Sequence, residues 1–214
     1  MRRFLILGGG LLFLFLLIGG FLLKRVSKLE KSLQKGGEKV IMEEGKLKVL
    51  MIVAPVNFRD EEYQKPREVL ESAGWKVEVA SKGVKEAQGM LGARVSIDKE
   101  LSEINLDEYE GVIFVGGSGT TVYFEDQLVL NLAKSAYEKG KVIGAICIAP
   151  SILANAGILQ GKNATAYSSE EENLKAKGVK YTKSGVIVDG KIVTASGPQV
   201  AYEFGEKLVE VLGQ

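Results

Sequence analysis

The single cysteine of the 214-residue chain, Cys147, is the side chain best suited to nucleophilic chemistry. It follows directly after the apolar run 141–146, which is typical of a strand buried on both faces, and a helix is predicted over 149–156. A side chain at such a strand-to-helix turn points into the ligand cleft, and the amides that open the next helix favour its thiolate. The alternative is a small core residue, because free cysteines are often buried. Position alone therefore favours a reactive thiol.

A pair of glycines could supply a second part of such a site. Gly116 and Gly117 follow another apolar run, 109–115, at the end of a predicted strand. Glycine lets the backbone approach a ligand closely, so these amides could bind an oxyanion that develops on a substrate. The same pattern also describes an ordinary strand-to-helix turn, so on its own it is weak support for a site.

Three consecutive acidic residues, Asp60, Glu61 and Glu62, follow the first predicted strand at 48–54. A carboxyl group that projects from a helix at this position could reach the cleft. If it were desolvated beside the thiol, it could stay protonated, donate a hydrogen bond to the thiolate, or act as an acid or base. Acidic residues also commonly occupy the first turn of a helix, where they complement its dipole. Side-chain chemistry alone does not choose among the three.

The elements that must position these residues alternate between strands and helices along the chain. This order predicts an α/β fold with a mostly parallel sheet sandwiched between helices. Ligands bind such sheets beyond the carboxyl ends of the strands, where the thiol, the glycines and the acidic residues all fall. The dipeptide Asp189-Gly190 indicates a hairpin. The predicted strands are 48–54, 75–80, 109–115, 141–146, 180–188 and 191–195, with a small hairpin within 81–105, and the predicted helices are 60–73, 126–139, 149–156 and 198–212.

Composition excludes several classes of site. The chain contains no histidine, which excludes Ser-His and Cys-His catalysis within it and any histidine-ligated metal site. One cysteine excludes an intramolecular disulfide. The net charge of +1 gives no indication of a nucleic-acid partner. We therefore expect neither a metal nor a cofactor, and no nucleic acid.

The amino-terminal residues predict a membrane segment. Residues 4–23 carry no charge, and twenty residues of helix span about 30 Å, the thickness of the hydrocarbon core of a bilayer. A cleaved secretory signal is the alternative, but no small-residue cleavage site follows the run. We expect a transmembrane anchor at 1–25, a charged linker at 26–46 and an α/β domain at 47–214. The protein would then be a single-pass membrane protein, with the flanking lysines and arginines favouring a cytoplasmic domain.

Four segments together resemble the ThiJ/PfpI superfamily. They are KVLMIVAPVNFRDEEYQKP, GVIFVGGSG, VIGAICIAPSILANAGILQGKNATAY and VDGKIVTASGP, and they occur in the family's order over about residues 47–213. The resemblance implies the class I glutamine amidotransferase-like fold, a flavodoxin-like sandwich, in agreement with the alternation of elements.

The resemblance also assigns site residues. The family's elbow cysteine matches Cys147, and its helix glutamate lies four residues before a proline, which is Pro66 here, so that Glu62 is the match. In the family this glutamate hydrogen-bonds the cysteine sulfur. The anion-binding amides correspond to those of Gly116, Gly117 and Ile148. Tyr167 stands where members carry tyrosine or histidine near the cleft, and a structural role is the alternative for it.

The chain departs from the protease-like members of the family at one decisive position. Those members have histidine directly after the cysteine, whereas this chain has Ile148 and no histidine anywhere. The resemblance therefore implies a cysteine-dependent hydrolase or lyase of the glyoxalase or deglycase type. Its substrates would be small reactive carbonyls, α-oxoaldehydes or their adducts on damaged protein side chains. A non-catalytic redox sensor or chaperone is the alternative, and an intracellular peptidase is disfavoured. We also expect a homodimer or a higher homo-oligomer.

Overall fold

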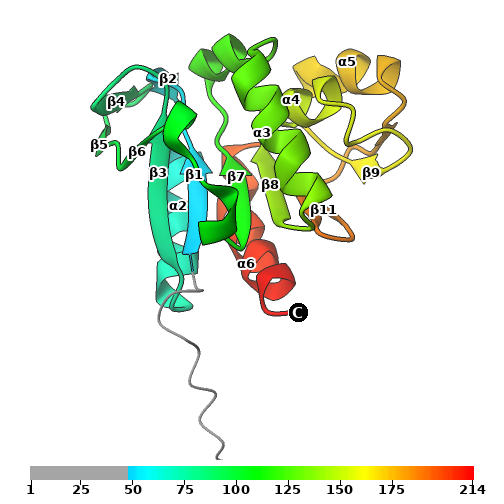
Figure 1. Ribbon diagram of the computed structural model, residues 1–214. Coiled ribbons are helices and arrows are strands. Elements are labelled where there is room, and N and C mark those ends of the chain that lie inside the picture. The colour runs from blue at the N-terminus through cyan, green and yellow to red at the C-terminus, as the bar shows by residue number, and fades with distance from the viewer. Residues whose placement is uncertain (1–47) are drawn as a thin grey trace, which may run out of the picture. The chain divides into compact units, whose positions relative to one another are not determined.

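A seven-stranded sheet forms the centre of residues 48–214, the part of the chain that the computed structural model describes (Figure 1). The strands lie in the order β11-β12-β8-β7-β1-β3-β6. Every neighbouring pair is parallel except β11 with β12. The predicted α/β class with a mostly parallel sheet is therefore confirmed. The strands are β1 (Lys48–Ile52), β3 (Lys76–Ser81), β6 (Lys99–Glu100), β7 (Gly111–Phe114), β8 (Val142–Ile146), β11 (Val186–Asp189) and β12 (Ile192–Ala195).

The three central strands are buried on both faces because helices cover both sides of the sheet. All residues of β7 and β8 are buried, and in β1 only Lys48 reaches the surface. This explains why these strands have near-continuous apolar sequences rather than an alternating pattern. The core is divided by the sheet into two clusters of apolar side chains, one against each layer of helices.

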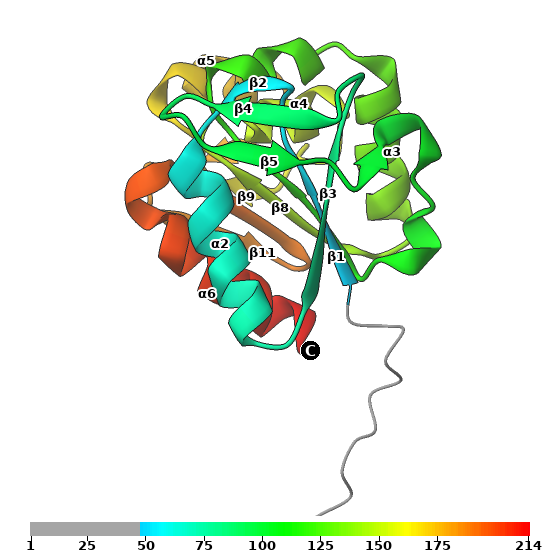
Figure 2. The same ribbon diagram turned by 90° about the vertical axis from the view of Figure 1, so that its left-hand side faces the viewer.

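Two helices cover each face of the sheet. α2 (Asp60–Ser72) and α6 (Ala201–Leu212) lie side by side on one face, as Figure 2 shows, and α3 (Gln127–Glu138) and α4 (Pro150–Asn155) cover the other. The two helices of the first pair approach closely at Gly205. A Cβ atom at that position would lie 2.9 Å from Cα of Pro66, so the contact requires glycine.

Shorter elements extend from the sheet. β2 (Val56–Phe58), β4 (Glu86–Gly89) and β5 (Arg94–Ser96) form a three-stranded sheet whose β4–β5 pair is the predicted small hairpin. The predicted strand 180–188 is divided instead, because β10 (Lys180–Tyr181) pairs with β9 (Asn163–Ala164) and only β11 pairs with β12. The remaining elements are α5 (Glu171–Ala176) and the short 3₁₀ helices η1 (Leu101–Glu103), η2 (Leu106–Glu108), η3 (Ser118–Tyr123), η4 (Ser168–Glu170) and η5 (Pro198–Val200).

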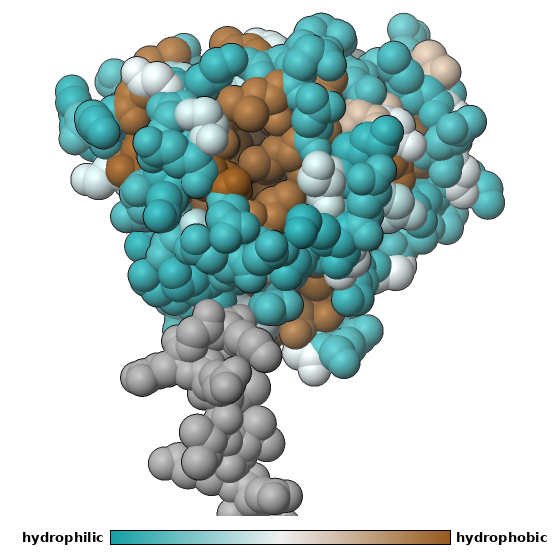
Figure 3. All heavy atoms as spheres, viewed as in Figure 1, coloured by the Kyte–Doolittle hydropathy of each residue, from teal (hydrophilic) through white to brown (hydrophobic). Residues whose placement is uncertain are grey.

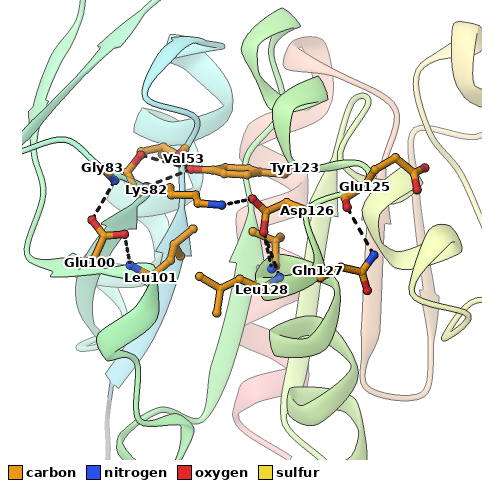
Figure 4. A network of polar contacts seen from close by, with 12 residues as sticks. Val53, Lys82, Gly83, Glu100, Leu101, Tyr123, Glu125, Asp126, Gln127 and Leu128 are labelled. Atoms are coloured by element: carbon orange, nitrogen blue, oxygen red, sulfur yellow. Dashed lines mark hydrogen bonds and ion pairs between the residues drawn. The ribbon is translucent and has the colours of Figure 1, made fainter.

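A polar network ties the carboxyl ends of β1 and β3 to η3 and α3 (Figure 4). The hydroxyl of Tyr123 donates to the carbonyl oxygen of Val53 at 3.0 Å and accepts the amide of Lys82 at 3.2 Å. The ammonium of Lys82 pairs with Asp126, whose carboxylate also accepts the amides of Leu128 and Val129 that open α3. Because the Tyr123 hydroxyl is buried and hydrogen-bonded, it fixes how η3 meets the ends of the two strands.

The face of the protein seen in Figure 1 is hydrophilic over most of its area, as the space-filling view of Figure 3 shows. Figure 3 shows apolar residues gathered around one hollow in the upper middle of the view.

The prediction of a membrane protein from the sequence is wrong. Within residues 48–214, no helix has the length and apolar character needed to cross a bilayer. The run 4–23, on which the predicted anchor rested, lies outside the described residues, as does the predicted linker 26–46. The single-pass membrane localisation expected from the sequence is overturned by this finding and is not retained.

Candidate active site

Cys147 occupies a strained turn between β8 and α4. Its φ angle is +63°, in the left-handed region that residues other than glycine rarely adopt. The turn is held on both sides, because the amide of Cys147 donates to the carbonyl oxygen of Ala195 at 2.8 Å and its carbonyl oxygen accepts the amide of Tyr167 at 2.8 Å. A left-handed conformation costs about 1–2 kcal/mol. Such strain is typical of positions where the surrounding structure presents a side chain for function.

Glu62 lies in the first turn of α2 and is completely buried. Neither of its carboxyl oxygens has a hydrogen-bond partner among the described residues. A Cβ atom added to Gly116 would lie closer than 3 Å both to Oε2 of Glu62 and to Cβ of Cys147. The carboxyl group and the cysteine therefore meet at Gly116, and only glycine leaves room for this contact.

Burial controls the ionisation of the carboxyl group. Desolvation raises the pKa of Glu62 to about 7, although the nearby thiol of Cys147 and the guanidinium of Arg59 act in the opposite direction. Near neutral pH the carboxyl group can therefore hold or release a proton. This is the property that a general acid or base needs.

The thiol is coupled to this carboxyl group. Burial, followed by the negative charge of Glu62, raises the pKa of Cys147 to about 12, while the amides of Gly117 and Ile148 lower it. Because each anion opposes the other, the pair carries at most one negative charge near neutral pH. When the proton resides on Glu62, its opposing charge disappears and the two amides favour the thiolate.

The three acidic residues that follow β1 have separate surroundings. Asp60 is buried and accepts the amides of Leu91 and Ala93, each at 2.8 Å, which fixes the turn between β4 and β5. Glu61 forms an ion pair with the guanidinium of Arg59, with 2.7 Å between Oε2 and Nε. Of the three carboxyl groups, only that of Glu62 is placed against Cys147.

The glycine pair follows β7 and lies beside the cysteine. Gly117 has a φ angle of +106°, and a Cβ atom there would overlap the backbone of Asn57, Phe58 and Arg59. Gly116 accepts the amide of Arg59 at 2.9 Å, which ties the start of α2 to this turn. The backbone between β1 and α2 therefore packs directly on the glycine turn, and this contact positions the site.

A cavity of about 330 Å³ opens over these groups. Five of the six predicted site residues line it: Cys147, Glu62, Gly117, Ile148 and the half-exposed Tyr167. The further lining residues, which the sequence did not single out, are Arg59, Met90, Ser118, Ser169, Pro198 and Gln199.

These further residues lie in the short 3₁₀ helices and connections that follow different strands, so no local pattern marks them. Arg59 is the exception, because it directly precedes the acidic residues whose carboxyl groups were considered for the cleft. Within residues 48–214, no group of three or more histidine, cysteine or acidic side chains is placed to hold a metal ion.

Comparison with known proteins identifies the family. The family model described as DJ-1/PfpI matches residues 47–211. An uncharacterized protein of Methanocaldococcus jannaschii is 43% identical over 168 residues, which cover 77% of this chain and 82% of that protein. A protein of Pyrococcus abyssi named a deglycase is 30% identical, with 76% and 98% covered. A Caenorhabditis elegans protein named a glutathione-independent glyoxalase is 28% identical, with 76% and 87% covered.

The fold gives the same answer. The crystal structure of a ThiJ/PfpI domain protein from Brachyspira murdochii superposes with a TM-score of 0.77 and 35% sequence identity, covering 78% of this chain and 97% of that one. The resemblance seen in the sequence motifs is thereby confirmed. From its amino-acid motifs, its matched residues and its fold, the chain belongs to the DJ-1/PfpI family.

Proposed function

We propose that this protein is a cysteine-dependent enzyme of the glyoxalase or deglycase type, which acts on α-oxoaldehydes or on their adducts with amines. In this proposal Cys147 is the nucleophile and Glu62 is the acid and base. The names of the deglycase and glyoxalase relatives support the class of activity. The geometry of the cysteine and its neighbours supports the roles of the individual residues.

One observation carries the proposal: a fully buried carboxyl group, which has no hydrogen-bond partner within residues 48–214, lies against the only thiol of the chain. Buried carboxyl groups that serve the fold are normally hydrogen-bonded, as Asp60 is. Leaving Glu62 unsatisfied destabilises the fold, so this arrangement is best understood as a functional one.

The chemistry follows from these two groups. The thiolate of Cys147 bonds to the aldehyde carbon, and the aldehyde oxygen takes up a proton to give a hemithioacetal. Glu62 removes the hydrogen of that carbon as a proton and returns a proton to the neighbouring carbon, while the hydroxyl proton passes to the neighbouring oxygen. This converts the hemithioacetal into the thioester of a hydroxy acid. Water hydrolyses the thioester, releases the acid and restores the thiol. Methylglyoxal would yield lactate without glutathione or any external oxidant.

The backbone amides have a role in the same sequence of steps. The amides of Gly116, Gly117 and Ile148 are proposed to stabilise the oxygen or sulfur anion that appears during attack and hydrolysis. The amides of Gly117 and Ile148 already lower the pKa of the thiol. Tyr167, which lines the cavity, is proposed to contact the substrate. An aldehyde adduct on an amine would reach the same hemithioacetal by exchange: the C–S bond forms as the C–N bond breaks, and the amine leaves with the proton given up by the thiol.

The same amides favour a second candidate, a cysteine redox sensor. A sulfinate at Cys147 would gain the hydrogen bonds that lower the thiol pKa. A peptidase is disfavoured, because no histidine is present to activate the thiol and to protonate a leaving amine.

Lactate formation from methylglyoxal by the purified, reduced full-length protein tests the proposal. We expect steady turnover that disappears in Cys147→Ala and persists in Glu68→Gln, a matched change at an exposed glutamate of α2. Absence of lactate with the intact protein would remove the enzymatic proposal. If mild peroxide then converted Cys147 to its sulfinic acid, the sensor would replace it.

Two further expectations stay predictions. We propose that residues 47–214 carry the activity. We also propose that the protein assembles as a homodimer or a higher homo-oligomer, which sedimentation of the purified protein would test.

A further inference from the structure

Arg59 places a fixed positive charge in the wall of the cavity that contains Cys147. It is the residue that immediately precedes α2, and its side chain is 30% exposed. The guanidinium is oriented by two hydrogen bonds to Glu61, from Nε to Oε2 at 2.7 Å and from Nη2 to Oε1 at 3.1 Å. A planar fork held in this way presents its remaining N–H groups in a defined direction.

Part of the donor capacity of Arg59 is unused. A guanidinium has five N–H donors, and the side-chain hydrogen bonds of Arg59 within residues 48–214 go to Glu61 alone. The charge of Arg59 also acts on the reacting groups, because it lowers the pKa of Glu62. The cavity therefore offers both hydrogen-bond donors and a positive charge within the range of the carboxyl group.

The other lining residues do not compete for this charge. Among the described residues, 48–214, Arg59 is the only basic one in the lining, and the acidic residue there, Glu62, lies buried against the thiol. The remaining polar groups of the wall are the hydroxyls of Ser118, Ser169 and Tyr167 and the amide of Gln199. Hydroxyl, amide and guanidinium donors around one cavity are a set that recognises a carboxylate.

We propose that Arg59 binds an anionic group of the substrate, so that the preferred substrates are α-oxoaldehydes that carry a carboxylate. This inference rests on the proposed function and specifies its substrate class. In this reaction R–CO–CHO and water give R–CH(OH)–COO⁻ and a proton, and the carboxylate in R is unchanged. Arg59 makes no bond to the reacting carbons and acts by binding and orienting the substrate.

The first test compares dioxovalerate, an α-oxoaldehyde with a terminal carboxylate, with its uncharged methyl ester. We expect the full-length protein to have the higher kcat/KM for the acid. A hydrogen bond to a charged group is worth roughly 10- to 100-fold in binding. Arg59→Gln should therefore lower the ratio of the two kcat/KM values by at least about tenfold. Arg67→Gln removes the same charge from α2 at a position that contacts Tyr63 and Glu71 instead, and it should keep the ratio.

The second test does not depend on turnover. Iodoacetate and iodoacetamide alkylate the same single thiol and differ mainly in charge. We expect Arg59→Gln to lower the ratio of the iodoacetate rate to the iodoacetamide rate by about tenfold, while Arg67→Gln leaves it unchanged. Because both reagents need the thiolate, any change in the pKa of Cys147 cancels in the ratio.

The outcomes separate the two proposals. If dioxovalerate and its ester give no hydroxy acid but the alkylation ratio depends on Arg59, the proposed enzymatic function fails and the anion site stands. If turnover occurs and neither ratio depends on Arg59, the enzymatic function stands and the assignment of Arg59 is overturned.

Discussion

Removing the thiol of Cys147 leaves Glu62 to titrate alone, so that the effect of burial on its pKa can be measured. In Cys147→Ala the carboxyl group titrates alone, without a partner that shares its proton. Burial raises the pKa of Glu62 to about 7 in the folded protein, and the thiol that opposes this shift is absent in the variant. In the unfolded chain a glutamate has a pKa of about 4.3. At a pH between these two pKa values, the folded protein therefore keeps a proton on Glu62 that the unfolded chain releases.

The sign and size of the effect follow from proton linkage. Between the two pKa values the unfolded state binds fewer protons than the folded state, so the free energy of unfolding decreases as the pH rises. One pKa unit corresponds to 1.36 kcal/mol, and the difference between the two states is between two and three units. We expect Cys147→Ala to lose about 3 kcal/mol of stability from this group between about pH 4 and pH 7, and more if its pKa rises further.

Urea unfolding of Cys147→Ala and of Cys147→Ala/Glu62→Gln at a series of pH values measures this contribution. Subtracting the free energies of unfolding of the two variants at each pH cancels the contributions of every other titrating group that they share. It should favour the glutamine variant progressively as the pH rises from about 4 to 7. A difference that stays constant with pH, or one that favours glutamate at neutral pH, would refute the assignment of Glu62 as a buried carboxyl group with a raised pKa.

Three further substitutions test the geometry of the site, each by urea unfolding. Gly117→Ala should lose about 3 kcal/mol or more, because its φ angle of +106° and the backbone of residues 57–59 leave no room for a Cβ atom; a loss below about 1 kcal/mol would contradict the close approach. Cys147→Gly should be about 1 kcal/mol more stable than Cys147→Ala, since glycine adopts the left-handed turn without strain; equal stability would argue against that strain. Asp60→Ala should lose about 2 kcal/mol, because two amides of the turn after β4 lose their acceptor, and Asp60→Asn should recover part of the loss.

The fold was largely predictable from the sequence because its strands are buried on both faces. The apolar runs that become β1, β7 and β8 are short and nearly continuous, and glycines mark the ends of the helices between them. The extent of the strand beginning at Lys180 was not predictable. Its first two residues pair with β9, a partner that is distant in sequence and too short to have a pattern of its own.

In the candidate site, too, contacts between segments distant in the sequence could not be predicted. The position of Cys147 at a strand-to-helix turn could be anticipated, because strand and helix patterns directly flank it. The choice among three adjacent carboxyl groups depended on the resemblance to the family, because side-chain chemistry left it open. The structure gives each group a different neighbour: Asp60 meets two amides, Glu61 meets Arg59 and Glu62 meets Cys147. The contacts of Asp60 and Glu62 join segments that are distant in the sequence, so they depend on the tertiary fold, whereas the pair of Glu61 with Arg59 is local.

The most direct test of the central claim is the rate at which Glu62→Gln converts methylglyoxal into lactate. Glutamine preserves the size of the side chain and cannot accept or return a proton. General acid–base catalysis typically contributes about 10²- to 10⁴-fold, so we expect kcat to fall by at least about 100-fold in Glu62→Gln and to stay near that of the unaltered protein in Glu68→Gln. Lactate formation by Glu62→Gln at the rate of the unaltered protein would contradict the account.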